Sequence, residues 1–168
     1  MPLSPDDAGD AALAVDVTLQ CEADFDETRA QTLADRFRRV AGKAGVEAGR
    51  VDLTIVDDAE MTRLHERYQG VSGTTDVLTF DLRDTPDDPL EGDLALCLDE
   101  ARRQAAGRGH ALDDELLLYA VHGLLHLLGF DDDTEVAAEA MHRREDELLA
   151  AAVDVTFVGL AAPVSTEA

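Results

Sequence analysis

The chain has 168 residues, enough for one hydrophobic core but too few for two domains of ordinary size. The sequence contains no run of about 18 apolar residues that could cross a bilayer, so we expect no membrane partner. The 37 Asp and Glu residues against 14 Lys and Arg give a net charge of −23, which repels nucleic acid at low salt. Because salt screens such repulsion, we hypothesise a host with a salty cytoplasm.

The two ends of the chain differ in composition from its middle. MPLSPDDAGD lacks the basic and apolar stretches of a secretion signal, which predicts a cytoplasmic location. Residues 1–12 are predicted to be a flexible acidic tail, residues 13–157 a single domain and residues 158–168 a C-terminal tail. Cys21 and Cys97 form no Cys-x-x-Cys pair, and both are predicted to be small buried apolar residues.

Apolar residues that alternate with polar ones predict four strands, and apolar residues three or four apart predict helices. Asp26 is predicted to cap the first helix and Gly45 to end it. The order βαβαββ followed by three helices is typical of an α+β fold, with helices on a small mixed sheet of about four strands. The strands are expected at residues 13–19, 51–56, 76–82 and 92–98, and the helices at 28–44, 60–68, 99–106 and, with one break, from there to 152.

The segment DDELLLYAVHGLLHLLGFDDD carries the strongest functional signal. Asp113 or Asp114 is predicted to cap this helix, whose apolar residues occupy nearly every face, as in a buried helix. His122 and His126 are four residues apart, so their imidazoles lie on one face where a single ion can bridge them. Gly129 can take the left-handed conformation that ends a helix and turns the following aspartates back toward the histidines.

The pattern H-x-x-x-H-x-x-G-x-x-D thus predicts one metal site per chain, with His122, His126 and Asp132 as ligands and a fourth position for water. Asp131 and Asp133 are alternatives to Asp132, because the turn decides which carboxylate points inward. Taken singly, such a histidine would be a core residue and such aspartates a solvated cap. Zinc is the expected ion, with Mn²⁺ or another divalent ion as an alternative. The domain is therefore predicted to be a metallohydrolase, with no side-chain general base identified.

The segment HGLLHLLGFDD resembles the signature of the YbeY family of bacterial endoribonucleases, which act in ribosomal RNA maturation. LTIVDDAEMTRLHERYQG, TTDVLTFDL and EGDLALCLDEARRQA are similar to the other recurring blocks of that family, in the same order. The resemblance implies a single-strand-specific, metal-dependent endoribonuclease that acts in 16S rRNA 3′-end maturation and ribosome quality control. An rRNA precursor would be its substrate and the ribosome its partner. Nothing in the sequence predicts the oligomeric state.

Two positions depart from the family pattern. The third ligand is commonly His in the family, whereas position 132 is Asp; the resemblance favours Asp132 over its neighbours. Gln69 follows Tyr68 where many members carry an arginine for the RNA phosphate, and an amide cannot neutralise charge. Arginines that could substitute lie in three clusters, each of which is more simply a solvated helix face: Arg36, Arg38 and Arg39; Arg102 and Arg103; Arg143 and Arg144.

Two other functions fit the same residues. The ligand pattern is shared with one branch of the zincin metalloproteases, so a zincin-like metal-site helix is expected, but the Glu that acts there as general base is replaced by Gly123. A non-catalytic, ribosome-associated protein with a structural metal is the third alternative. His65, His110 and His142 have no partner at ligand spacing and are predicted to lie on the surface.

Overall fold

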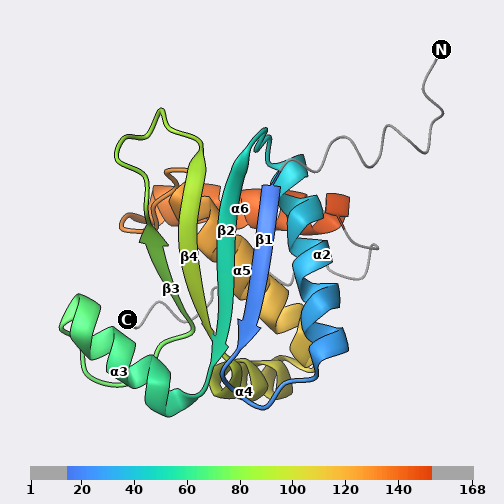
Figure 1. Ribbon diagram of the computed structural model, residues 1–168, viewed down its shortest axis with the longest axis vertical. Helices are drawn as coiled ribbons and strands as arrows, with labels where there is room; N and C mark the ends of the chain where they lie inside the picture. Colours follow the sequence, from blue (N-terminus) through green and yellow to red (C-terminus); the bar gives the residue numbers. More distant parts are fainter. Residues whose placement is uncertain (1–14, 153–168) are drawn as a thin grey trace.

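The computed structural model describes residues 15–152, so the predicted tails at 1–12 and 158–168 lie outside the described residues. The predicted order of strands and helices is confirmed, with ends shifted by one or two residues (Figure 1). The elements are β1 (Val15–Cys21), α2 (Glu27–Lys43), β2 (Gly49–Val56), α3 (Asp58–Gln69), β3 (Val77–Asp81), β4 (Leu90–Cys97), α4 (Leu98–Arg108), α5 (Leu112–Leu127) and α6 (Glu135–Ala152).

The four strands form one mixed sheet in the order β1-β2-β4-β3. β1, β2 and β4 are parallel, and β3 joins the edge of β4 antiparallel to it. Along β2, Val51, Leu53 and Ile55 alternate with more exposed residues and are fully buried. This period of two places one face of the strand in the main core. The predicted α+β class with a small mixed sheet is therefore confirmed.

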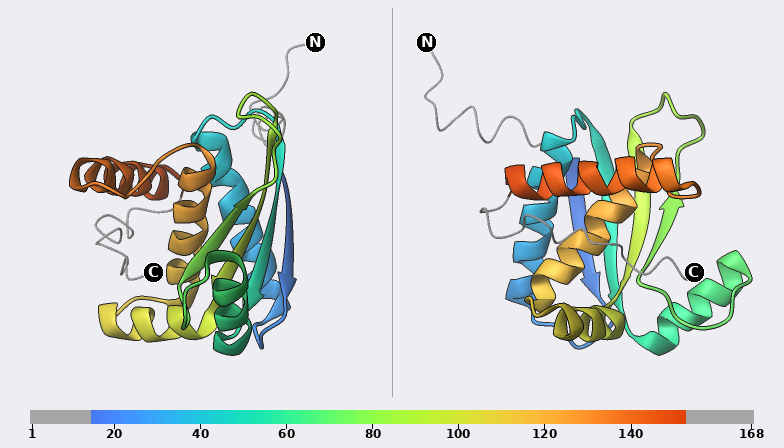
Figure 2. Two further views of the ribbon diagram at one scale, coloured as in Figure 1. Left: turned by 90° about the vertical axis from the view of Figure 1, so that its left-hand side faces the viewer. Right: turned by 180° about the vertical axis from the view of Figure 1, so that it is seen from behind.

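Helices cover the two faces of the sheet unequally. Figure 2 shows α5 and α2 stacked on one face, with α6 crossing outside them and α4 at one end. On the opposite face, α3 covers a smaller cluster that includes Met61 and Leu78. α5 thus lies between the sheet and α6, which explains why it is apolar on nearly every side. No described helix is long and apolar enough to cross a membrane.

The predicted helix ends are partly confirmed. Asp26 caps α2 by accepting from the Arg29 backbone N–H at 3.0 Å, and Gly45 follows the helix with a φ of 87°. The prediction of Asp113 or Asp114 as the cap of α5 is wrong, because the helix begins at Leu112 without a side-chain cap. Both carboxylates instead bind arginines of α2, Asp113 with Arg29 and Asp114 with Arg36. Their negative charge in the first turn still interacts favourably with the helix dipole.

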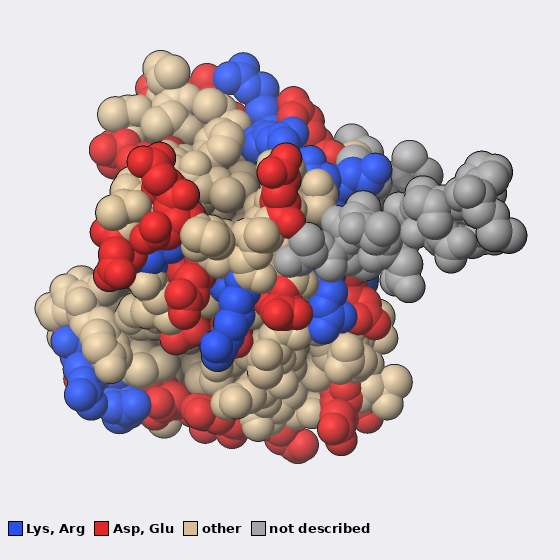
Figure 3. Space-filling view, turned by 45° about the horizontal axis from the view of Figure 1, so that its top comes forward, with Lys and Arg blue, Asp and Glu red and all other residues tan. Residues whose placement is uncertain are grey.

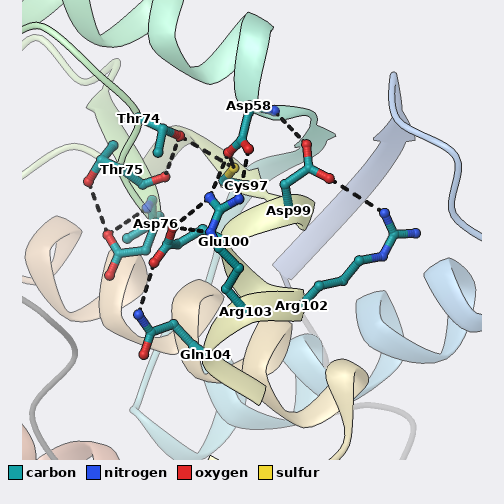
Figure 4. A network of polar contacts seen from close by, with 11 residues as sticks. Asp58, Thr74, Thr75, Asp76, Cys97, Asp99, Glu100, Arg102, Arg103 and Gln104 are labelled. Carbon is teal, nitrogen blue, oxygen red and sulfur yellow. Dashed lines mark hydrogen bonds and ion pairs between the residues drawn. The ribbon is translucent and has the colours of Figure 1, made fainter. Parts of the chain in front are cut away.

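The two cysteines differ in environment. Cys97 is fully buried, as predicted, and burial raises the pKa of its thiol to about 11. Cys21 is exposed, so its predicted burial is wrong; it is the last residue of edge strand β1. Figure 4 shows the network around Cys97, in which its thiol lies 3.3 Å from the Asp58 carboxylate. Arg103 donates to the same carboxylate at 2.8 Å and holds the pKa of Asp58 down at about 2.

Candidate metal centre

The last turns of α5 bring the two predicted histidine ligands together. The Nε2 atoms of His122 and His126 lie 3.1 Å apart, and the rings meet edge to face. The helix then ends in a left-handed turn, with Gly129 at a φ of 95° and the Phe130 N–H donating to the Leu125 carbonyl at 2.9 Å. This is the chain reversal that was predicted at Gly129. The prediction rested on glycine because a residue with a side chain rarely adopts that φ.

The reversal directs Asp132 toward the histidines. Its Oδ2 lies 3.7 Å from the Nε2 of His122 and 4.0 Å from that of His126. Ligand atoms of these three residues lie within 4.8 Å of one another. Asp131 and Asp133 are exposed, whereas Asp132 is half-buried. The structure therefore brings together the three residues predicted as ligands and leaves the two alternatives outside the cluster.

The hydrogen bonds behind the two rings decide what the cluster can bind. The Nδ1 of His122 lies 2.5 Å from a carboxylate oxygen of Glu145, and the Nδ1 of His126 lies 3.1 Å from the Phe130 carbonyl. Both partners are acceptors, so they favour a proton on each Nδ1, and the neutral ring then presents its lone pair at Nε2. Two lone pairs and a carboxylate oxygen that face one another repel, unless a cation lies between them. The donor set fits a divalent metal.

Electrostatics around His122 reflect the same arrangement. Its side chain is only 8% exposed, and burial by itself lowers the pKa of the imidazole. The hydrogen bond with Glu145 and the charges of Asp76 and Asp132 outweigh burial, so the net shift of the pKa is upward. Asp76 accepts from the backbone N–H of Val77 at 2.8 Å, and burial raises the pKa of its carboxyl group. Three carboxyl groups, those of Glu145, Asp76 and Asp132, thus act on the histidine.

The remaining histidines are less exposed than predicted. His65 is buried, at 1% exposure, and its Nδ1 hydrogen bonds with the Gly73 carbonyl at 2.9 Å, so its predicted surface position is wrong. It lies on the side of α3 that packs on the sheet. His110 is also largely covered and pairs with the buried Glu115. His142 is half-buried. None of these three belongs to the described metal-ligand cluster.

Most of the arginines considered as candidates for binding phosphate form ion pairs within the chain. Gln69, at the end of α3, is exposed. Carboxylates lie within ion-pair distance of five of the seven arginines in the three clusters, and these pairs are Arg36–Asp114, Arg38–Asp35, Arg102–Asp99, Arg103–Asp58 and Arg144–Glu147. The carboxylates partly neutralise the charge of these arginines, which weakens their attraction for a phosphate.

Gly123 follows the first histidine at a point where α5 touches the sheet. A Cβ at this position would lie 2.8 Å from a methyl group of Leu94 and 3.2 Å from the hydroxyl of Thr79. A glutamate there would need Leu94 to move and would bury its carboxylate against the sheet. Position 123 therefore supplies no general base of the zincin kind, and a larger side chain there would require Leu94 to shift.

Sequence reasoning missed Glu145, the buried partner of His122 on α6. A signal was present, because Met141, Glu145, Leu148 and Leu149 follow the spacing of one buried helical face. A charged residue in such a stripe needs a buried partner.

Comparisons with known proteins identify the family of the chain and a solved structure with a similar fold. A family model described as Endoribonuclease YbeY matches residues 17–153. The Endoribonuclease YbeY of Moorella thermoacetica is 44% identical over 121 residues, covering 66% of this chain and 74% of the relative. That of Acidothermus cellulolyticus is 38% identical over 152 residues, covering 83% and 91%. The solution structure of TM1509 from Thermotoga maritima shares the fold, with a TM-score of 0.56 at 23% identity over 80% of this chain and 90% of that one. Because the family model spans most of its length, the chain belongs to the YbeY family of endoribonucleases.

Proposed function

We propose that the chain is a metal-dependent endoribonuclease that cleaves single-stranded RNA at an ion held by His122, His126 and Asp132. Family membership supports the nuclease activity. The observation that carries the metal site is the convergence of ligand atoms of two histidines and one aspartate within 4.8 Å of one another. We propose zinc as the ion, because two imidazoles and one carboxylate are a common ligand set of catalytic zinc.

The charge of the site suits a phosphodiester. A bound divalent ion would stabilise negative charge on the phosphate and acidify water. The chain contributes two neutral imidazoles and one carboxylate as ligands. A divalent ion together with these three ligands would therefore carry one positive charge. No described side chain is assigned as general base. His122 and His126 hold their Nε2 atoms toward the ion through the partners of their Nδ1 atoms.

The biological setting is proposed from the family alone. We propose that the substrate is a 16S rRNA precursor, cut during 3′-end maturation and ribosome quality control in the cytoplasm, with the ribosome presenting it. A net charge of −23 opposes RNA binding, and Figure 3 shows acidic side chains spread over one face with basic ones in small separate groups. Presentation by a partner would offset that repulsion.

Peptidase activity is not proposed, because Gly123 occupies the position at which a zincin peptidase carries its glutamate general base. The alternative of a structural metal without catalysis predicts metal binding without RNA cleavage. The assay below therefore distinguishes it from the nuclease.

The test is metal content by elemental mass spectrometry, on protein purified without chelator, alongside cleavage of single-stranded RNA. Wild type is expected to hold about one metal per chain. His122→Ala and Asp132→Ala should lose both metal and cleavage. Asp131→Ala and Asp133→Ala are matched controls, because they remove exposed carboxylates outside the cluster, and both should keep metal and cleavage. A metal-free wild type, or equal loss in all the aspartate variants, would refute the site.

A further inference from the structure

Glu145 is a charged side chain on the buried face of α6. The residue is 0% exposed and lies among Met141, Leu148 and Leu149, which are also buried. Its Oε1 contacts the Nδ1 of His122 at 2.5 Å. Its Oε2 is buried and has no hydrogen-bond partner among the described residues. A carboxylate without solvent must be compensated locally, and the hydrogen bond to His122 is the compensation that the structure shows.

We propose that Glu145 is a positioning residue for the metal ligand His122. The inference rests on the proposed metal site. By accepting the Nδ1 proton, Glu145 fixes the tautomer that leaves the Nε2 lone pair directed at Asp132 and His126. It also fixes the rotation of the ring about its bond to the chain, because the acceptor belongs to a different helix. Because the tautomer and the rotation of the ring are already fixed, the ring needs little rearrangement when the ion binds.

The two histidine ligands are supported unequally. His126 hydrogen bonds through its Nδ1 to the neutral Phe130 carbonyl at 3.1 Å and is 28% exposed. His122 is 8% exposed and hydrogen bonds to a buried anion at 2.5 Å. Hydrogen bonds to ionised acceptors are shorter and stronger than those to neutral ones. The orientation of the His122 ring and the basicity of its Nε2 therefore depend on Glu145 more than those of His126 depend on the Phe130 carbonyl.

The charge of Glu145 supports the same role. Glu145 is buried and adds a negative charge behind His122 to the charges of Asp76 and Asp132. Negative charge at a buried ring strengthens the attraction of the ligands for a cation. α6 begins at Glu135, close in sequence to Asp132. The packing of α6 on α5 therefore places both Asp132 and Glu145 near His122.

The experiment measures zinc affinity by competition with a chromophoric chelator, using metal-free full-length protein. Glu145→Gln keeps the shape and an acceptor oxygen but removes the charge, and it should lower zinc affinity about 10- to 100-fold. Glu145→Ala removes both and should lose more. Glu115→Gln is the matched control, because Glu115 is equally buried and pairs with His110, a histidine outside the cluster. That variant should bind zinc as wild type does.

A second readout separates positioning from a merely structural role. Nitrogen NMR of the imidazoles in the metal-free protein should show His122 protonated at Nδ1 in wild type and a mixture of tautomers in Glu145→Ala. Unchanged zinc affinity in Glu145→Gln, or an equal loss in Glu115→Gln, would overturn the inference. Zinc affinity and RNA cleavage are measured separately. A selective loss of affinity in Glu145→Gln therefore supports the role of Glu145 even if wild type proves not to cleave RNA.

Discussion

Arg83 joins the end of β3 to the C-terminus of the metal-site helix. Its guanidinium donates to the Leu127 carbonyl at 2.5 Å, and to the Asp81 carboxylate at 2.9 and 2.7 Å. The Arg83 side chain is only 12% exposed. The last carbonyls of a helix have no partner within the helix, so the Leu127 carbonyl, next to the proposed ligand His126, depends on this arginine.

Replacing Arg83 by Met keeps much of the aliphatic stem and removes the donors. A hydrogen bond from a charged group contributes about 1.5–3 kcal/mol, and a cation at a helix C-terminus about 0.3–1 kcal/mol. We expect Arg83→Met to lower the free energy of unfolding by about 2–3 kcal/mol, which shifts Tm down by about 4–12 °C for a chain of this size. Urea denaturation of the metal-free protein measures the free energy directly.

Arg50→Met is the matched control for this substitution. Arg50 lies on β2 and is 62% exposed, and its side chain hydrogen bonds to the Asp52 carboxylate alone among the described residues. An exposed pair of this kind contributes little, so no measurable change is expected. Arg83→Lys should recover only part of the loss, because an ammonium cannot reach both acceptors with a planar fork. If Arg83→Met changed stability no more than Arg50→Met, the reasoning would be refuted.

Three further predictions follow from single features. Native protein should react with one equivalent of a thiol reagent at Cys21 and with a second, at Cys97, only on unfolding, because Cys97 is buried; two fast thiols would contradict this. Gly129→Ala should cost about 1–2 kcal/mol in urea denaturation because of its left-handed φ, whereas Gly107→Ala in α4 should stabilise by about 0.5–1 kcal/mol. With a net charge of −23, the unfolding midpoint should rise with KCl, and a flat response would remove the salty-host hypothesis.

The fold could be predicted from the sequence because its determinants are local. The period of two in β2 and the all-round apolar character of α5 each require only neighbouring residues. The prediction for the start of α5 was wrong for the opposite reason. Asp113 and Asp114 have the composition of a cap, but α2 offers Arg29 and Arg36 at ion-pair distance, and that contact depends on how the two helices pack.

The same distinction separates the metal ligands from the groups that support them. His122, His126 and Asp132 lie on one helix turn and the reversal at Gly129, so their convergence follows from the geometry of a short segment. Glu145 reaches His122 from another helix, and no local pattern fixes that distance. In this chain a local sequence pattern therefore predicts the proposed ligands, whereas it does not predict Glu145. The way to find the latter is to ask which charged residues interrupt an apolar face, and which buried group compensates each one.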